Sequence, residues 1–314
     1  MQKPNAPVIF LMGPTASGKT GLAVELAQHF PIELISVDSA LVYQGMDIGT
    51  AKPDAATLKR APHHLIDLIL PTQSYSAAQF RDDSLRLIQD IHARNKIPFF
   101  IGGTMLYFNT LQHGMNALPE ADAAIRKELV QRAEQLGWPT MHRELAKIDP
   151  ITAQRLQPND AQRIERALEI YTITGQPMSA LLEQDNNNTF HYRLLKLALM
   201  PSDRGILHQR IAQRFDTMLE QGLAGEVTRL RTQYPQLTAD TPSMRCVGYR
   251  QTWEHLDGKY DIATLREKGI IATRQLAKRQ MTWLRGMDDT EIMDCLYSSL
   301  LDSTSNKLMR WIKA

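Results

Sequence analysis

The chain has 314 residues, of which 43% are hydrophobic and 22% charged, and its formal net charge at pH 7 is +2. This length and composition exclude a fibrous or disordered protein and are typical of a globular protein with one large domain and a smaller second one. The N-terminal apolar run, Val8 to Met12, is too short for a signal-peptide core or a membrane span, so we expect a cytoplasmic protein without membrane contact.

The first hundred residues alternate between buried strands and amphipathic helices. We predict strands at Val8–Met12, Ile32–Val37 and Ile97–Ile101, with one helix after the first strand and another over Ala77–Ala93. This alternation indicates an α/β fold with a parallel sheet and flanking helices, whose ligands bind at the carboxyl ends of the strands.

From about Pro119 to Leu182 the strand pattern stops and helical periodicity takes over, before a strand at Tyr192–Met200 returns to the sheet. The remaining chain is mostly helical. We therefore predict a core domain in two parts, residues 1–116 and 189–314, separated by a mainly helical insertion domain at residues 117–188.

A phosphate loop follows the first strand. Eight residues match the pattern GxxxxGK[ST] in full: Gly13, Pro14, Thr15, Ala16, Ser17, Gly18, Lys19 and Thr20. Between a strand and a helix, this pattern indicates a P-loop NTPase-like fold, in which backbone amides bind an anion, Lys19 adds a charge and Thr20 can ligate Mg²⁺. The loop alone does not identify the reaction. Most proteins that contain it are kinases or NTPases, which transfer or hydrolyse the terminal phosphate of a nucleotide.

Two polar residues follow predicted strands at the same edge of the sheet. Asp38 ends the second strand and can ligate magnesium, act as a base or cap the turn that follows it. Thr104, after Gly102 and Gly103, can bond a substrate or cap a helix. The residues alone leave these alternatives open.

The basic residues gather near the C-terminus. Between Arg266 and Arg285 there are six basic residues and one acid, a net charge of +5, so the rest of the chain carries −3 of the total +2. Arg274, Lys278 and Arg285 can share a helix face near Trp283, as a site for an anionic polymer requires. The same pattern also fits a surface helix with an ordinary buried tryptophan.

Eight segments, in this order, carry a family resemblance: GPTASGKT (13–20), ISVDSALVYQGMDIGTAKP (35–53), PHHLID (62–67), YSAAQF (75–80), GGTMLYF (102–108), NDAQRIERALE (159–169), RCVGYRQ (245–251) and ATRQLAKRQMTWLR (272–285). Together they closely resemble the bacterial tRNA dimethylallyltransferase family, also called the tRNA isopentenyltransferases. The resemblance implies transfer of the dimethylallyl group from dimethylallyl diphosphate to the exocyclic N6 amine of adenosine 37, in tRNAs that read codons beginning with U.

The resemblance also implies roles for single residues. Asp38 would be the base that takes the amine proton, and Thr104 would hold that amine in line. Lys19 would be catalytic as well as diphosphate-binding, and Arg214 and Arg163 would join the phosphate loop in binding the diphosphate. The implied cofactor is Mg²⁺, with Thr20 as its ligand.

On the RNA side, the implied partner is the tRNA anticodon stem-loop, from which adenine must be turned out, and we expect the protein to be a monomer. The implied tRNA-contacting residues are Asp38, Ser39, Ala40, Leu41, Thr104, Arg126, Gln162, Arg163, Ile164, Glu165, Arg166, Arg245, Cys246, Val247, Gly248, Tyr249, Arg250, Lys278, Arg279, Gln280, Met281, Thr282, Trp283, Leu284 and Arg285. Two other functions fit parts of the sequence: a P-loop small-molecule or nucleotide kinase, and a non-catalytic RNA-binding module whose loop is only an anion site.

Overall fold

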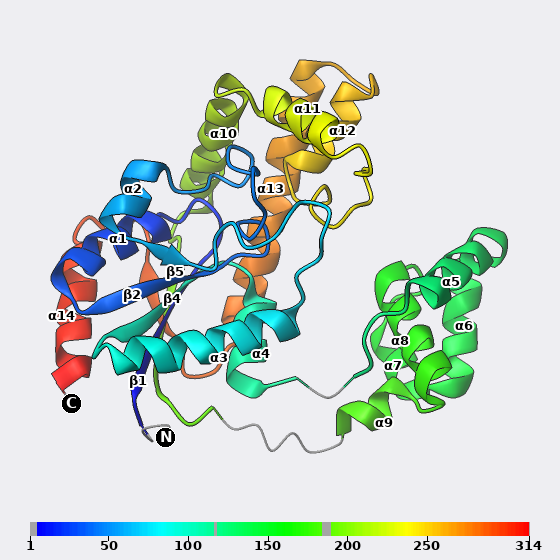
Figure 1. The fold of residues 1–314 in the computed structure, drawn as a ribbon, viewed down its shortest axis with the longest axis horizontal. Helices are drawn as coiled ribbons and strands as arrows, with labels where there is room; N and C mark the ends of the chain where they lie inside the picture. The colour runs from blue at the N-terminus through cyan, green and yellow to red at the C-terminus, as the bar shows by residue number, and fades with distance from the viewer. Residues whose placement is uncertain (1–4, 116–117, 184–189, 314) are drawn as a thin grey trace. The chain divides into compact units, whose positions relative to one another are not determined.

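The computed structural model describes residues 5–115, 118–183 and 190–313 (Figure 1). The chain divides into two compact units, here called the core unit (Met1–Gln112 with Phe190–Ala314) and the helical unit (His113–Thr189). The boundaries predicted after residues 116 and 188 fall at positions outside the described residues.

The core unit is built on a parallel sheet with the strand order β3-β2-β4-β1-β5-β6. The strands are β1 (Pro7–Met12), β2 (Ile32–Val37), β3 (His63–His64), β4 (Ile97–Gly102), β5 (Arg193–Met200) and β6 (Glu291–Asp294). β1 is central: Ile9 pairs with Phe99 of β4 and with Leu195 of β5. The predicted parallel α/β fold is confirmed, and β2 has the predicted bounds.

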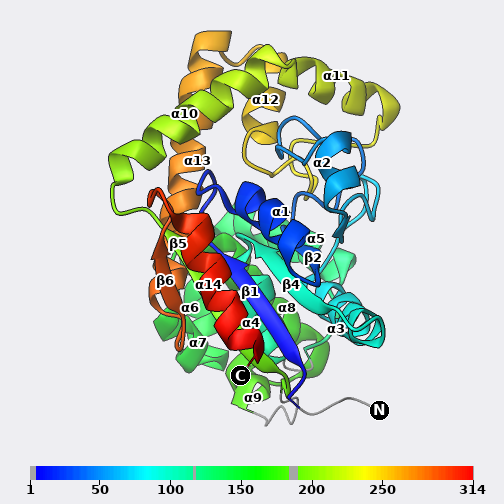
Figure 2. The same ribbon diagram turned by 90° about the vertical axis from the view of Figure 1, so that its left-hand side faces the viewer.

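Helices cover both faces of this sheet. Those outside the helical unit are α1 (Lys19–His29), α2 (Ala55–Arg60), α3 (Ala77–Ala93), α4 (Met105–His113, whose last residue belongs to the helical unit), α10 (Arg204–Glu220), α11 (Leu223–Gln233), α12 (Tyr249–Leu256), α13 (Ile262–Arg285) and α14 (Leu300–Lys313). Alternate β1 side chains enter opposite cores, so Leu11 packs with α1 and α14 while Phe10 packs with α3 and α4 (Figure 2).

A third hydrophobic core joins α10, α11, α12 and α13 to the segment that follows β2. That segment contributes Val42, Tyr43 and Met46, so it packs against this bundle of helices. α10 and α13 approach closely at Gly269, where a β carbon would lie 1.9 Å from the Phe215 ring. Any larger residue at Gly269 would push the two helices apart.

The helical unit contains α5 (Ala123–Leu136), α6 (Trp138–Ile148), α7 (Pro150–Arg155), α8 (Ala161–Thr174) and α9 (Met178–Glu183). It has its own core, in which Leu129, Met141, Leu145 and Ile164 are buried. Within the parts of the chain that the structure describes, no helix combines the length and apolar character needed to cross a membrane.

Candidate active site

The phosphate loop connects β1 to α1. Gly18 lies just before the helix with φ of +82°, a left-handed conformation that favours glycine. Gly13 packs so closely that a β carbon there would lie 2.9 Å from the Leu199 carbonyl oxygen. The Lys19 ammonium donates a hydrogen bond to the Pro14 carbonyl at 2.7 Å. The first turn of α1 contains no acidic residue, so its amides face the loop without a competing carboxylate.

A cavity of about 250 Å³ lies beside the loop, wholly within the core unit. Its lining contains these predicted site residues: Thr15, Ala16, Ser17, Gly18, Lys19, Thr20, Asp38, Ala40, Leu41, Arg214, Cys246, Val247, Gly248 and Gln280. The structure therefore brings the loop, the end of β2, α10 and the segment before α12 to one place. Gly13, Pro14 and Thr104 do not belong to the lining, although Thr15 and Gly103, their neighbours in sequence, do.

Two cations in this cavity, Lys19 and Arg214, have no carboxylate partner among the residues that the structure describes. Burial, and then the nearby Arg214 guanidinium, lower the pKa of Lys19 to about 8, although the Asp38 carboxylate acts in the opposite direction. Burial also lowers the pKa of Arg214, against the same opposing effect. Neither cation forms an ion pair among the described residues; Lys19 and Arg214 bond instead to backbone carbonyls. Because charges that are partly withdrawn from water need a partner, this pair favours an anionic ligand.

Asp38 and Thr104 are connected through Ser39. One Asp38 carboxylate oxygen accepts a hydrogen bond from the Ala40 amide at 2.8 Å, so the turn-capping role is realised. The Ser39 amide donates to the Thr104 hydroxyl at 3.1 Å. Asp38 also lines the cavity, so this hydrogen bond fixes the carboxylate at the cavity wall.

Gln280 of α13 bridges two parts of the site. Its side-chain oxygen accepts from the Thr15 amide at 2.8 Å, and its side-chain nitrogen donates to the Gly103 carbonyl at 2.9 Å. Sequence reasoning had placed Gln280 only among the tRNA contacts. Its partners lie 265 and 177 positions away, so no local pattern could have revealed this bridge.

Three buried polar atoms in the cavity lining lack a hydrogen-bond partner in the described part of the chain: Ser17 Oγ, Ser36 Oγ and His63 Nε2. The other ring nitrogen of His63 bonds to the Ala61 carbonyl at 2.7 Å, and burial lowers the pKa of His63. A neutral ring that donates through Nδ1 leaves Nε2 as an acceptor. Ser36 and His63 are thus site residues that the sequence pattern alone gave no strong reason to select.

Arg210 does not join Arg214 in this cavity. Arg210 and Arg214 lie four residues apart on α10, a spacing at which two side chains share a helix face. Arg210 instead lines a second cavity with Cys295, one that shares Ala16, Ser17 and Gly18 with the first. One turn of α10 is therefore enough to direct the two guanidinium groups to different cavities.

The exposed face of α13 carries the basic patch. Arg274, Lys278, Arg279 and Arg285 are exposed and form no ion pair among the described residues. Trp283 is 46% exposed, so it is not the ordinary buried tryptophan that the sequence also allowed. Two other basic residues are engaged within the protein: Arg266 pairs with Asp216 at 2.5 Å, and Lys268 lies over the Tyr260 ring. The free charge is thus concentrated in the second half of α13.

Four predicted tRNA contacts have buried side chains: Ile164, Tyr249, Met281 and Leu284. We therefore expect these positions to support their neighbours rather than to touch RNA through their side chains. Arg245, Gln162 and Arg163 are exposed, and Arg163 lies 3.3 Å from the Asp160 carboxylate within the helical unit. Its contact with the diphosphate stays a prediction.

Two further predicted tRNA contacts, Arg126 and Arg166, meet at a buried carboxylate of the helical unit. Glu169 accepts hydrogen bonds from Arg126 at 2.8 Å, from Arg166 at 2.6 Å and from the Asp122 amide at 2.8 Å. Burial acts to raise the pKa of Glu169, but these hydrogen bonds outweigh it and leave the pKa lowered. The two arginines therefore have a structural role whether or not they also meet RNA.

The fold and the cavity define a P-loop-type α/β protein that is built to bind a phosphate-bearing ligand. Known proteins refine this class. The family model described as IPP transferase matches residues 41–287. A tRNA dimethylallyltransferase of Methylobacillus flagellatus is 60% identical over 98% of both chains, and one of Chromobacterium violaceum is 61% identical over 89% of this chain and 86% of that relative.

Solved structures agree with these relatives. The tRNA isopentenylpyrophosphate transferase of Bacillus halodurans has a TM-score of 0.70 and 35% identity, covering 99% of this chain and 96% of that one. A eukaryotic dimethylallyltransferase acting on tRNA has a TM-score of 0.79 and 29% identity, over 97% of this chain and 78% of that one. The chain therefore belongs to the IPP transferase family, and the family resemblance inferred from the sequence is confirmed.

Proposed function

We propose that this chain transfers the dimethylallyl group from dimethylallyl diphosphate to the N6 amine of adenosine 37, in tRNAs that read codons beginning with U. Prenyl transfer to tRNA is the activity for which its relatives are named. The observation that carries the finer proposal is one cavity lined by the phosphate loop, by Asp38 and by two half-buried cations that form no ion pair among the described residues.

The chemistry needs these three features together. The bond between N6 and the allylic carbon forms as the carbon–oxygen bond to the diphosphate breaks, and the bonding electrons leave with the diphosphate. Lys19, Arg214 and the loop amides stabilise the charge that develops on this leaving group. The amine proton passes to the second oxygen of Asp38, and Thr104 holds the amine in line. Adenine must be turned out of the anticodon loop to reach this cavity.

We propose Mg²⁺ as the cofactor, with Thr20 as its protein ligand. Magnesium commonly keeps several waters and binds through one or two protein oxygens together with substrate phosphates. Thr20 lines the cavity at the first turn of α1, and no group of three or more His, Cys, Asp or Glu residues suited to a metal occurs among the described residues. Both facts fit an ion shared with the diphosphate, whose charge it would neutralise.

The direct test offers the protein, Mg²⁺ and tRNA either dimethylallyl diphosphate or ATP, followed by mass spectrometry of the digested nucleosides. We expect prenylated adenosine from dimethylallyl diphosphate without ATP. Phosphorylation that depends on ATP, with no prenylated nucleoside, would favour the kinase alternative and overturn the proposal. The same assay on a tRNA with guanosine at position 37 should give no product. The monomeric state stays a prediction from the sequence, to be checked by light scattering.

A further inference from the structure

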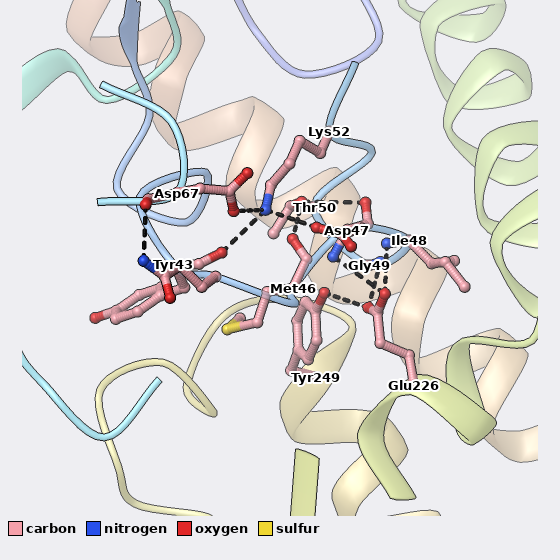
Figure 3. A network of polar contacts seen from close by, with 11 residues as sticks. Tyr43, Met46, Asp47, Ile48, Gly49, Thr50, Lys52, Asp67, Glu226 and Tyr249 are labelled. Atoms are coloured by element: carbon pink, nitrogen blue, oxygen red, sulfur yellow. Dashed lines mark hydrogen bonds and ion pairs between the residues drawn. The ribbon is translucent and has the colours of Figure 1, made fainter. Parts of the chain in front are cut away.

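The segment Met46–Lys52, here called the wall loop, forms one wall of the cavity. Gly49, Thr50 and Ala51 belong to the cavity lining. Inside the loop, the Thr50 hydroxyl donates to the Met46 carbonyl at 2.7 Å. Lys52 bonds to the Tyr43 carbonyl at 3.0 Å and forms ion pairs with Asp47 and Asp67 (Figure 3). The wall loop is therefore a folded unit whose position decides the shape of the cavity.

A buried carboxylate from α11 holds this loop from behind. Glu226 is 2% exposed, and its two oxygens accept hydrogen bonds from the amides of Asp47 at 3.1 Å, Ile48 at 2.8 Å and Gly49 at 3.2 Å (Figure 3). The Tyr249 hydroxyl donates to the same carboxylate at 2.5 Å. In the described part of the chain no basic side chain pairs with Glu226, so backbone and phenol donors alone satisfy it.

The contact is also sterically close. A β carbon on Gly49 would lie 2.5 Å from the Tyr249 ring and 2.8 Å from the Leu223 side chain. Burial raises the pKa of Tyr249, and the Glu226 carboxylate raises it further, so this phenol keeps its proton and donates it. The wall loop thus has little freedom to move relative to α11 and α12.

The held loop touches a diphosphate-site cation. Arg214 donates a hydrogen bond to the Thr50 carbonyl at 3.3 Å, and this guanidinium lines the cavity. Thr50 is one residue beyond the amides that Glu226 binds. A change at Glu226 therefore reaches Arg214 through one peptide unit, although Glu226 itself does not belong to the cavity lining.

We propose that Glu226 is a positioning residue for the diphosphate site: together with Tyr249 it sets the Thr50 carbonyl, which in turn holds Arg214 in line for the leaving group. This inference rests on the proposed function, because it assigns Arg214 to the diphosphate. It also gives the buried Tyr249 a role in the diphosphate site, one that does not require its side chain to touch RNA.

The test measures binding of inorganic diphosphate with Mg²⁺ by calorimetry, in the wild type and in Glu226→Gln. The amide keeps the shape of the side chain but replaces one acceptor oxygen with a donor that faces other donors. We expect about tenfold weaker diphosphate binding. The variant should melt well above the temperature of the measurement, so that it is fully folded when binding is measured. Should Glu226→Gln fail to fold, Tyr249→Phe carries the same test with a smaller loss, because it removes only one hydroxyl.

A double-mutant cycle separates positioning from general loosening of the fold. In an Arg214→Lys background, Glu226→Gln should weaken diphosphate binding no further, since the guanidinium on which it acts is gone. The same fold-change in both backgrounds would overturn the inference. A matched control is Glu254→Gln on α12, because Glu254 also accepts from a tyrosine hydroxyl, that of Tyr260 at 3.2 Å, outside the wall loop. Its diphosphate affinity should equal that of the wild type.

The two proposals fail in different ways. If the wild type does not bind diphosphate, the proposed function is overturned, and this inference with it. If the wild type binds diphosphate and Glu226→Gln binds it equally well, only the positioning role is overturned.

Discussion

Charged groups are treated in opposite ways at two places in this protein, at Glu169 of the helical unit and in the cavity of the core unit. In the helical unit, Glu169 is enclosed by Arg126, Arg166 and a backbone amide, and its hydrogen bonds are satisfied within the chain. In the core unit, Lys19 and Arg214 line a cavity, and within the described part of the chain they bond only to carbonyl groups. A saturated network stabilises a fold, whereas half-buried cations without an ion pair leave binding energy for a ligand. The difference supports the proposal that the chemistry takes place in the core-unit cavity.

The largest expected effect concerns Asp38, the carboxylate in the cavity that has an oxygen to spare. Asp38→Asn keeps the hydrogen bond to the Ala40 amide but cannot take up a proton, so single-turnover prenyl transfer should fall about a thousandfold. Binding of tRNA should remain. The matched control is Asp54→Asn at the start of α2, where asparagine caps a helix equally well and transfer should be unchanged. A rate for Asp38→Asn near that of the wild type would remove Asp38 as the base.

The saturated network should respond in stability instead. Glu169→Gln removes the charge that two arginines share, and we expect the free energy of unfolding of the helical unit to fall by about 3 kcal/mol. Urea unfolding followed through Trp138, the tryptophan of this unit, measures the change. Diphosphate affinity should stay at the wild-type value. A loss of diphosphate affinity without a loss of stability would break the contrast between the two units.

The unpaired cations should make diphosphate binding depend on pH. Lys19 has a lowered pKa, about 8, so above this pH the ligand-free lysine is increasingly neutral. A bound anion favours the ammonium form, so binding between pH 8 and 10 should take up a proton, and affinity should fall by up to about tenfold per pH unit. Below pH 8 this contribution is constant.

The control for this pH dependence is Lys19→Arg, whose guanidinium stays charged throughout the range. Its diphosphate affinity should therefore change with pH only through the titration of diphosphate itself, which affects the wild type equally. Calorimetry in buffers of different ionisation enthalpy counts the protons taken up. Identical pH profiles for the two proteins would show that Lys19 is already paired or lies away from the ligand.

The smallest effect is expected on the exposed face of α13. Arg274→Ala should lower the slope of log K against log salt for tRNA binding by about 0.7–0.9, the share of one phosphate contact. Arg266→Ala on the same helix should change it less, because Arg266 pairs with Asp216. Filter binding over a series of salt concentrations measures both slopes. Equal changes would mean that pairing within the protein does not decide which cations meet RNA.

Much of the fold could be read from the sequence where the pattern is long and regular. α3 and β2 have the predicted bounds because an amphipathic helix and a fully apolar strand are strong local signals. β3 and β6 were missed because one has two residues and the other has a single buried side chain, Met293. Such edge strands are defined by their neighbours and not by their own sequence.

The site shows the same division. The phosphate loop and Asp38 follow from a motif and from the end of a strand, and both line the cavity. The hydrogen bonds of Gln280 to Thr15 and Gly103, and those of Glu226 to the wall loop, could not be predicted, because each joins residues more than 170 positions apart. Helix propensity predicts that a glutamate lies on a helix, but the amides from which it accepts hydrogen bonds are known only from the folded structure.

The 24 residues of α13 carry the exposed cations at one side and, through Gln280, hold the Thr15 amide and the Gly103 carbonyl at the other. Because one helix makes both sets of contacts, a displacement of α13 on one side also displaces it on the other. Thermodynamic reciprocity then applies: if bound RNA changes the affinity for diphosphate by some factor, bound diphosphate changes the affinity for RNA by the same factor. Where binding of one ligand strengthens binding of the other, departure of either one weakens the binding of the ligand that remains.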